Sequence, residues 1–347
     1  MSAPTFAASF GPGRWRVRAL VLAVVVACTG NPGQAATTTV RVVVPPYLSN
    51  APLFIAEEEG YFAAEGLRLE LVPLARAALA IPALITGDLE VLAGAINAGV
   101  LNAVGRGASL RLVANKGYVA ADADCVSTAL LARRGLLESL GDRGPSALRG
   151  RRLVMPNRAS FEGYVVDRFL SAVGLTIDAV ERVDIPGPAE LDAFRTGAID
   201  ATVSGEPWLT RILTSGHATA WKRAQELTPD FDYAFVMFGS SLLKRDPDVG
   251  RRFATAYLRG VRQYGQGKTD RNLDILSKHT QLDRELLRQS CWPTVRRDGR
   301  VDVKSVLEFQ AWAVERKFVD RSVPASEFLD PSFMEHANRA LGARGAP

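Results

Sequence analysis

The sequence predicts an α/β protein made of two similar, doubly wound lobes. Residues 86–94, Thr-Gly-Asp-Leu-Glu-Val-Leu-Ala-Gly, have a counterpart of similar pattern at residues 196–205. Around both segments short apolar runs alternate with amphipathic stretches, which is typical of parallel sheets covered by helices on both faces. Glycines just past helical stretches, as at Gly66 and Gly174, are the expected stop signals, because glycine adopts the left-handed conformation without steric penalty. The alternative to duplication is a chance echo within an ordinary α/β chain.

Each half is predicted to run strand, helix, strand, helix, strand. In the first half these elements are residues 40–44, 52–64, 67–72, 77–86 and 90–93. In the second half they are residues 152–155, 161–173, 179–185, 188–196 and 200–203. The apolar runs that we expect to complete the two sheets are residues 110–114, 127–132, 219–222 and 233–239.

After the last of these strands the pattern changes to helix only. Asp246 and Pro247 form a good helix start, an N-cap carboxylate followed by proline at the first helical position. Further helical stretches follow at residues 270–290 and 302–318, and we expect this C-terminal run to pack on the first lobe. The chain then crosses twice between the lobes, which makes a hinge. The predicted lobes are residues 36–126 with 233–347 for the first, and residues 127–232 for the second.

The N-terminus predicts an export signal. Residues 1–35 contain three arginines and no acidic residue, and their apolar run at 19–27 is too short to span a bilayer. Cleavage after Ala35 fits the small residues that a signal peptidase requires. The other option is lipidation of Cys28, because Val-Val-Ala-Cys at this position resembles a bacterial lipobox. Both options place the mature protein in the periplasm, and the second anchors it to a membrane.

The charge balance argues against a nucleic-acid partner. The 347-residue chain is 47% hydrophobic and 23% charged, which is ordinary for a globular protein. Its net charge is +5, of which the leader carries three positive charges, so that +2 remains without any long basic run. Cys125 and Cys291 are the only cysteines certain to survive processing, and they either form a disulfide or remain free thiols.

The residue types needed for catalysis do not occur in recognisable patterns. The histidines, His217, His279 and His336, lie far apart and without metal-ligand spacing. There is no G-x-S-x-G motif, and Gly-Gln-Gly-Lys-Thr at residues 265–269 lacks the first glycine of a P-loop. We therefore predict no catalytic residue, no metal site and no cofactor.

Loops beyond the carboxyl ends of parallel strands are the expected ligand site. Residues 45–52 and 156–161 are such loops, and each leads into a helix N-terminus, which suits an anionic head. Arg158 would add a positive charge there. The alternative for Ser49, Asn50 and Ser160 is simple helix capping.

Three more turns are expected to face the same cleft, at residues 74–77, 94–97 and 205–208. Tyr47, Phe161 and Trp208 would then form an aromatic wall, with core packing as the alternative.

Several motifs, taken in order, resemble the substrate-binding proteins of the nitrate, sulfonate and taurine ABC importers, whose superfamily includes binders of thiamine precursors. These motifs are Ala51-Pro52-Leu53-Phe54-Ile55-Ala56, Glu59-Gly60-Tyr61-Phe62, Glu65-Gly66-Leu67, Leu148-Arg149-Gly150-Arg151-Arg152-Leu153, Gly174-Leu175, Glu206-Pro207-Trp208 and Asp246-Pro247. The resemblance covers about residues 39–329. It implies a type II periplasmic binding-protein fold, a cleft that closes on a small molecule, and delivery to a membrane permease without enzymatic activity. We also expect a monomer.

The resemblance implies the site residues by position. Ligand contacts would be made by Tyr47, Ser49, Asn50, Ala51, Arg76, Asn97, Asn157, Ser160, Glu206 and Trp208. Arg158 and Phe161 are added to these predicted ligand contacts, because they lie in the loop at residues 156–161 and Arg158 carries a positive charge. Where relatives carry a Gly/Ser-rich turn, this chain has Leu-Ala-Arg-Ala-Ala-Leu at residues 74–79. This less polar turn argues against nitrate and favours an organic anion or an amphiphilic, aromatic or sulfonate-like molecule.

Two other functions stay open at this point. One is an enzyme on the same fold, since one branch of the superfamily makes a thiamine pyrimidine from pyridoxal phosphate and a histidine. In this sequence, however, no histidine lies near a predicted cleft turn. The other is an exported receptor that presents its ligand to a sensor instead of a permease.

Overall fold

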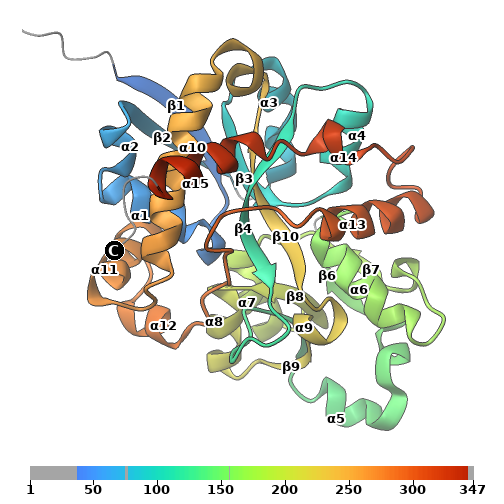
Figure 1. Cartoon of the computed structure of the whole chain (residues 1–347). Helices are drawn as coiled ribbons and strands as arrows, with labels where there is room; N and C mark the ends of the chain where they lie inside the picture. The colour runs from blue at the N-terminus through green and yellow to red at the C-terminus, as the bar shows by residue number, and fades with distance from the viewer. Residues whose placement is uncertain (1–36, 75–76, 156, 343–347) are drawn as a thin grey trace, which may run out of the picture. The chain divides into compact units, whose positions relative to one another are not determined.

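The computed structural model describes residues 37–74, 77–155 and 157–342, which form two five-stranded sheets surrounded by helices (Figure 1). The first sheet has the strand order β2 (Leu67–Pro73), β1 (Thr38–Val44), β3 (Val91–Ala95), β10 (Phe231–Phe238), β4 (Arg111–Val119). The second has the order β7 (Glu181–Val183), β6 (Arg152–Val154), β8 (Ala201–Gly205), β5 (Thr128–Arg133), β9 (Ala218–Arg223). We call each sheet with its helices a lobe. The two orders correspond strand for strand, so the predicted two-lobed α/β fold is confirmed.

One strand of each sheet runs against its neighbours, which corrects the expectation of parallel sheets. β10 pairs antiparallel with β3 and β4, and β5 pairs antiparallel with β8 and β9. Both strands follow a crossing between the lobes, so the chain enters the sheet from the hinge and not through a helical crossover. The start of β5 lies beside the end of β8, and the middle of β10 lies beside the end of β3, as the pairs Thr128–Gly205 and Ala234–Ala95 show.

Short helices connect the strands. In the first lobe they are α1 (Ala51–Glu58), α2 (Tyr61–Ala64), α3 (Ile81–Thr86) and α4 (Ala98–Gly105). In the second they are α5 (Leu136–Leu140), α6 (Phe161–Ser171), α7 (Glu190–Arg195), α8 (Trp208–Ser215) and α9 (Ala224–Leu227). The helix predicted over residues 52–64 is divided into α1 and α2, because Gly60 between them has a φ of 70°, which glycine adopts without strain.

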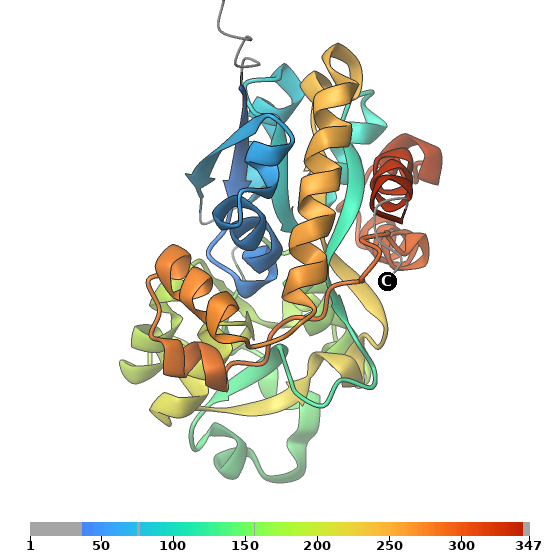
Figure 2. The same cartoon turned by 60° about the vertical axis from the view of Figure 1, so that its left-hand side comes forward.

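The C-terminal part is helical, as predicted. Its helices are α10 (Pro247–Tyr264), α11 (Asp270–Thr280), α12 (Arg284–Gln289), α13 (Val303–Glu315), α14 (Ala325–Phe328) and α15 (Ser332–Gly342). The Asp246 carboxylate caps α10 by accepting a hydrogen bond from the backbone N–H of Val249. Figure 2 shows α10 in orange on the first lobe, between α1 in blue and the C-terminal helices in red, and α10 packs against both α1 and α15. Its side chains Phe253, Tyr257, Val261 and Tyr264 recur at helical spacing and are all buried.

Helix α13 corrects the expectation that the C-terminal run packs on the first lobe alone, because it also lies beside α6 of the second lobe (Figure 1). Trp312 Nε1 donates a 2.8 Å hydrogen bond to the buried Asp167 carboxylate of α6, and Arg316 forms a 2.9 Å ion pair with the same carboxylate. One cluster of buried apolar side chains, which includes Leu92 and Leu153, extends through both lobes. The lobes therefore share a core.

A disulfide joins Cys125, in the first crossing, to Cys291, in the segment after α12, with the two Cα atoms 5.7 Å apart. Of the two alternatives for these cysteines, pairing is therefore the one observed. Among the described residues, no helix combines the length and apolar character needed to cross a bilayer. Cys28, Ala35 and the rest of the predicted leader lie outside the described residues, as does Arg76. The exact lobe boundaries stay a prediction.

Candidate functional site

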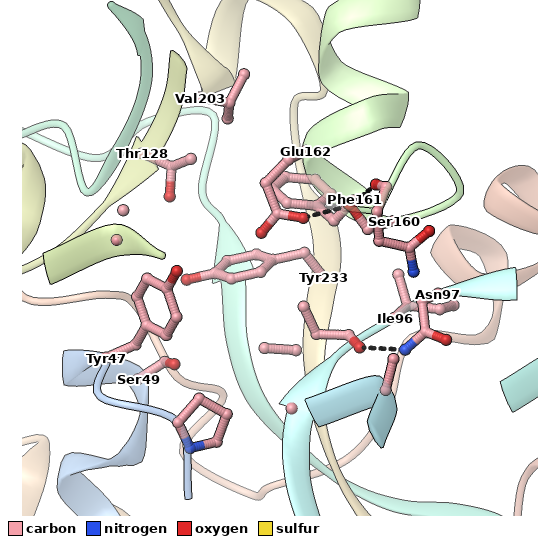
Figure 3. Close-up of a pocket in the computed structure, with 18 of the residues that line it drawn as sticks. Tyr47, Ser49, Ile96, Asn97, Thr128, Ser160, Phe161, Glu162, Val203 and Tyr233 are labelled. Atoms are coloured by element: carbon pink, nitrogen blue, oxygen red, sulfur yellow. Dashed lines mark hydrogen bonds between the residues drawn. The ribbon is translucent and has the colours of Figure 1, made fainter. Parts of the chain in front are cut away.

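A cavity of about 330 Å³ lies between the two lobes (Figure 3). Its first wall belongs to the first lobe and the segments returning to it, and consists of Pro45, Tyr47, Ser49, Ala78, Leu79, Gly94, Ala95, Ile96, Asn97, Lys116, Tyr233, Ala234 and Pro293. Its second wall belongs to the second lobe, and consists of Thr128, Val154, Asn157, Ser160, Phe161, Glu162, Ile185, Pro186, Gly187, Glu190, Val203, Gly205 and Glu206. The volume is in the range of small-molecule sites.

Loops of the two lobes are hydrogen-bonded to each other on one flank of the cavity. The backbone N–H of Leu48 donates to the carbonyl of Glu206 at 3.0 Å, and the Trp208 indole N–H donates to the carbonyl of Pro46 at 2.9 Å. Gly187 lies beside this contact, where a Cβ would come within 2.9 Å of the Trp208 ring. Only a glycine fits here without displacing the indole.

A second set of bonds closes the other flank. The backbone N–H of Ala98 donates to the carbonyl of Ala159 at 2.8 Å, and that of Phe161 donates to the carbonyl of Ile96 at 3.2 Å. Asn97 and Ser160 form a β-bridge between these two contacts. The turns after β3 and β6 thus meet, as the sequence predicted for turns at the edge of each sheet.

The predicted site residues separate into those in the wall and those outside it. In the wall are Tyr47, Ser49, Asn97, Asn157, Ser160, Phe161 and Glu206. Outside it are Asn50 and Ala51, both fully buried in the first lobe, and Arg158, which pairs with Asp178 and lies over the Phe318 ring. Trp208 is also outside, because its indole is used in the contact between lobes. Whether the wall residues contact a ligand stays a prediction.

Capping and hydrogen bonding account for part of the wall. Asn97 caps α4 by accepting from the backbone N–H of Val100, and its amide N–H donates to the carbonyl of Ala95. Glu206 is buried and accepts from the backbone and hydroxyl of Thr210 and from the backbone N–H of Cys291, at 2.7 to 3.1 Å. Burial raises the pKa of Glu206. Both side chains hold turns in place, and Glu206 also ties the second lobe to the disulfide segment.

The first wall carries a lysine that the sequence reading missed. Lys116 lies in β4, is 2% exposed, and donates a 2.7 Å hydrogen bond to the Ser49 hydroxyl. Burial lowers its pKa to about 7, because the charged ammonium loses its water. A lysine within an apolar strand has no sequence signal that distinguishes it from a surface lysine.

The second wall carries a buried carboxyl group that was also missed. Glu190 begins α7, is 5% exposed, and accepts a 3.2 Å hydrogen bond from the Thr202 hydroxyl through Oε1. Its other oxygen, Oε2, is buried and has no hydrogen-bond partner among the described residues. Burial raises the pKa of Glu190 to about 8, the neighbouring hydroxyls of Ser204 and Thr202 oppose the rise, and the Glu162 carboxylate adds to it. The turn before α7 was not among the loops predicted to face the cleft.

Glu162 occupies the helix N-terminus that was expected to bind an anion. It lies in the first turn of α6, and its Oε2 accepts a 2.5 Å hydrogen bond from the Ser160 hydroxyl, as Figure 3 shows. The chain itself therefore supplies a negative group at this positive helix end. Arg158, expected to strengthen the same site, is paired elsewhere. The expectation of an anionic head at this loop is not supported by this geometry.

Aromatic rings line the space between the two walls. Phe161 stacks on Tyr233 with ring centroids 4.7 Å apart, and Tyr47 and Tyr233 point toward each other in Figure 3. Burial is the largest cause of the raised pKa of both tyrosines, and the charges of Glu190 and Glu162 add to it at Tyr47. Tyr233 thus takes the place in the aromatic wall that was predicted for Trp208.

The described residues offer neither a metal-binding cluster nor a free thiol at the cavity. They contain no group of three or more His, Cys, Asp or Glu side chains that would hold a metal ion. None of the three histidines is in the described cavity wall, and His279 stacks on Phe54 instead. The two disulfide-bonded cysteines offer no thiol.

Comparison with known proteins identifies the fold. A family model described as the NMT1-like family matches residues 33–273. A search of the curated proteins finds no significant match.

Solved structures that share the fold include the ligand-binding component of an ABC-type import system from Staphylococcus aureus, with a TM-score of 0.73 and 16% identity, covering 87% of this chain and 99% of that one. The periplasmic nitrate-binding protein NrtA from Synechocystis PCC 6803 matches with a TM-score of 0.73 and 14% identity over 88% and 89% of the chains. The alkanesulfonate-binding protein SsuA from Xanthomonas axonopodis pv. citri, bound to MOPS, matches with a TM-score of 0.67 and 15% identity. The match covers 86% of this chain and 99% of that one. An enzyme, the desulfurization enzyme DSZB, also shares the fold, with a TM-score of 0.60 and 15% identity. This match covers 88% of this chain and 99% of that one. The type II periplasmic binding-protein fold is therefore confirmed.

Proposed function

The chain belongs to the NMT1-like family, and from this premise we propose that it is an exported solute-binding protein, which captures a small organic molecule between its lobes and delivers it to the permease of an ABC importer. The observation that carries the proposal is the cavity itself. It lies between two lobes whose loops meet on both flanks, so a molecule inside it would hold the lobes together.

The lining supports an organic ligand rather than a small inorganic ion. Phe161, Tyr233 and Tyr47 supply ring surface, and Ile96, Ile185 and Val203 supply apolar surface. An inorganic ion such as nitrate would leave these surfaces without a partner. A flat or partly apolar body, which the sequence also favoured, uses them.

Capture requires the flanking bonds to break and re-form. Ligand binding would shift an equilibrium between open and closed arrangements by its difference in affinity for the two. The two crossings between lobes are the segments about which such a movement would take place.

Thermal unfolding with a ligand panel tests this function. The purified mature protein is heated with sulfonates, aromatic acids, pyrimidines and organic amines, one at a time. Because binding to the folded state raises apparent stability, at least one class should raise the Tm. If no compound in any class does so, and no small molecule is found in the purified protein, solute binding is wrong.

Export and the permease are further parts of the proposal. Mass measurement of the mature chain separates the two processing options, since it shows either a start after Ala35 or a lipidated Cys28. Loss of ligand uptake in cells that lack the neighbouring permease genes would support delivery to an importer. Normal uptake together with a neighbouring sensor gene would favour the receptor alternative.

An enzyme remains the other function on this fold, as DSZB illustrates. In the described cavity wall the buried Lys116, whose pKa is lowered to about 7, would suit such chemistry as a nucleophile. The proposal nevertheless describes a binding protein, because the cavity lies between two lobes whose loops meet on both its flanks. Turnover of any panel compound by the purified protein would change that conclusion.

A further inference from the structure

The charged groups of the second wall indicate which ligands the cavity binds. Two carboxyl groups, those of Glu162 and Glu190, face it from the N-terminal turns of α6 and α7. Neither group takes part in any ion pair recorded between described residues. Arg158, the cation that was expected at this wall, is paired with Asp178 instead. The second wall therefore presents two carboxyl groups that form no ion pair among the described residues, and Glu190, whose pKa is raised to about 8, becomes negative as pH rises toward 8 or as a cation binds.

The unpartnered oxygen of Glu190 points more specifically to a donor. A buried polar atom without a hydrogen bond is costly, so such atoms are normally satisfied by protein, water or ligand. Glu190 Oε1 is satisfied by Thr202, whereas Oε2 lies buried in the cavity wall without a partner. A ligand N–H would supply the missing bond.

The aromatic surroundings favour a positively charged donor. The side chains of Tyr47, Phe161 and Tyr233 line the same cavity, and aromatic rings attract cations to their faces. Tyr47, Glu162 and Glu190 all line this cavity, and the charges of both carboxyl groups add to the raised pKa of the Tyr47 phenol. An amidinium or ammonium group would meet both at once.

We propose that the cavity binds an organic cation, whose N–H group donates a hydrogen bond to Glu190 Oε2 and whose charge is balanced by Glu190 and Glu162. This rests on the proposed solute-binding function and replaces the anionic ligand expected from the sequence. The apolar or aromatic body of the cation lies against the rings of Tyr47, Phe161 and Tyr233.

Three probes of the same shape test the charge directly. Benzamidine, benzamide and benzoate share one flat body and carry a positive, neutral and negative head. Titration calorimetry with the wild-type protein should give the tightest binding for benzamidine and the weakest for benzoate, with about ten-fold or more between them, as for charged hydrogen bonds. Tighter binding of benzoate, or no binding of any of the three, overturns the proposal.

Two variants show whether Glu190 is responsible. Glu190→Gln keeps the shape and the Thr202 bond but removes the charge, and it should lower benzamidine affinity about ten-fold or more while benzamide affinity changes less. Glu181→Gln removes the same charge from an exposed position of β7 and should change neither. An unchanged benzamidine-to-benzoate preference in Glu190→Gln contradicts the proposal.

The pH dependence of wild-type binding gives an independent reading, which does not rely on the variant folding. Glu190 must be charged to bind a cation, so benzamidine affinity should rise with pH until about 8 and then level off. Glu162 and Tyr47 line the cavity together with Glu190. Lys116, on the opposite wall, loses its proton near pH 7, and the loss of this positive charge adds to the rise in benzamidine affinity. In Glu190→Gln only the smaller Lys116 part should remain. A wild-type affinity that falls over this range contradicts the proposal.

The outcomes separate this inference from the function on which it rests. If an anion from the wider panel raises the Tm and benzamidine does not, the cation inference fails and solute binding stands. If no compound binds at all, both fail.

Discussion

The two walls of the cavity come from sheets of the same strand order, yet they carry ionisable groups of opposite kind. The first wall presents Lys116, bonded to Ser49, and the second presents Glu162 and Glu190. The repeated topology brings equivalent turns of both lobes to one place. The side chains on those turns differ, and the difference decides what the place can bind.

The same contrast holds for the turns that end the repeated segments. The turn after β3, residues 94–97, is small and uncharged, whereas the turn after β8 carries Glu206 and Trp208. Both of these side chains bond to groups outside the second lobe, Glu206 to Cys291 and Trp208 to Pro46. The side chains that distinguish the second turn from the first therefore hold the lobes together. The ionisable groups that distinguish the two cavity walls are on other residues, Lys116, Glu162 and Glu190.

The largest expected effect concerns the core that the lobes share. Leu92 in β3 and Leu153 in β6 are both fully buried in one continuous cluster. Leu92→Ala and Leu153→Ala should each lower the free energy of unfolding by roughly 2 to 5 kcal/mol, because each leaves a cavity. Urea unfolding followed by fluorescence and circular dichroism should show a single transition for both variants. Two separate transitions would mean that the lobes are independent.

The disulfide should give the next largest effect. Cys125 and Cys291 are 166 residues apart in sequence, and a cross-link over such a loop typically contributes about 2 to 4 kcal/mol. The double variant Cys125→Ser, Cys291→Ser should lose about this much in urea unfolding. Since Cys125 and Cys291 lie outside the cavity wall, the double variant should bind benzamidine, benzamide and benzoate with the same order of affinity as the wild type. A reversed preference would show that the disulfide shapes the walls.

The two walls should respond to pH in opposite directions. The pKa of Glu190 is raised to about 8, so the folded protein holds its proton more tightly and the free energy of unfolding falls as pH rises toward 8. The pKa of Lys116 is lowered to about 7, so the free energy of unfolding rises as pH rises from 7 toward 10.5, the ordinary value. Each slope is at most about 1.4 kcal/mol per pH unit.

Variants assign these slopes to the walls. Unfolding by urea over a range of pH should lose the falling slope in Glu190→Gln and the rising slope in Lys116→Met. If both variants keep the wild-type dependence of unfolding free energy on pH, then neither Glu190 nor Lys116 is buried as the structure shows.

The smallest effect concerns the contact between walls. Trp208→Phe removes the indole N–H that bonds to the Pro46 carbonyl and should cost about 1 kcal/mol of unfolding free energy. Trp221→Phe is the matched control, because Trp221 is half-buried with its ring against Phe169 and no indole hydrogen bond is recorded for it. Equal losses in the two variants would show that the bond between lobes contributes nothing.

Much of the fold could be predicted from the sequence because strand and helix patterns are local. The repeated segments, the stop glycines and the Asp246 cap each depend on a few neighbouring residues. The direction of β5 and β10 could not be predicted in this way. It depends on where the chain re-enters each sheet after a crossing, and no local pattern records that.

The site was predicted in part for the same reason. The turns after β1, β3, β6 and β8 do lie at the cavity, as strand ends should. Thr128 begins β5 and Tyr233 lies near the start of β10, and both strands are antiparallel to their neighbours. They were missed because the rule for parallel sheets places ligands only beyond the carboxyl ends of strands. Arg158 was expected in the site because its charge suits a helix N-terminus, but an ion pair with Asp178 turns it away.

The central claim is that a small molecule binds between the two walls, and native mass spectrometry tests it most directly. The mature protein is incubated with a small-molecule extract of the cells that produce it, beside Thr128→Trp, in which an indole would fill the cavity. The account predicts one non-covalent adduct on the wild-type protein, released on unfolding and absent from the variant. No adduct on the wild type, or the same adduct on Thr128→Trp, would contradict it.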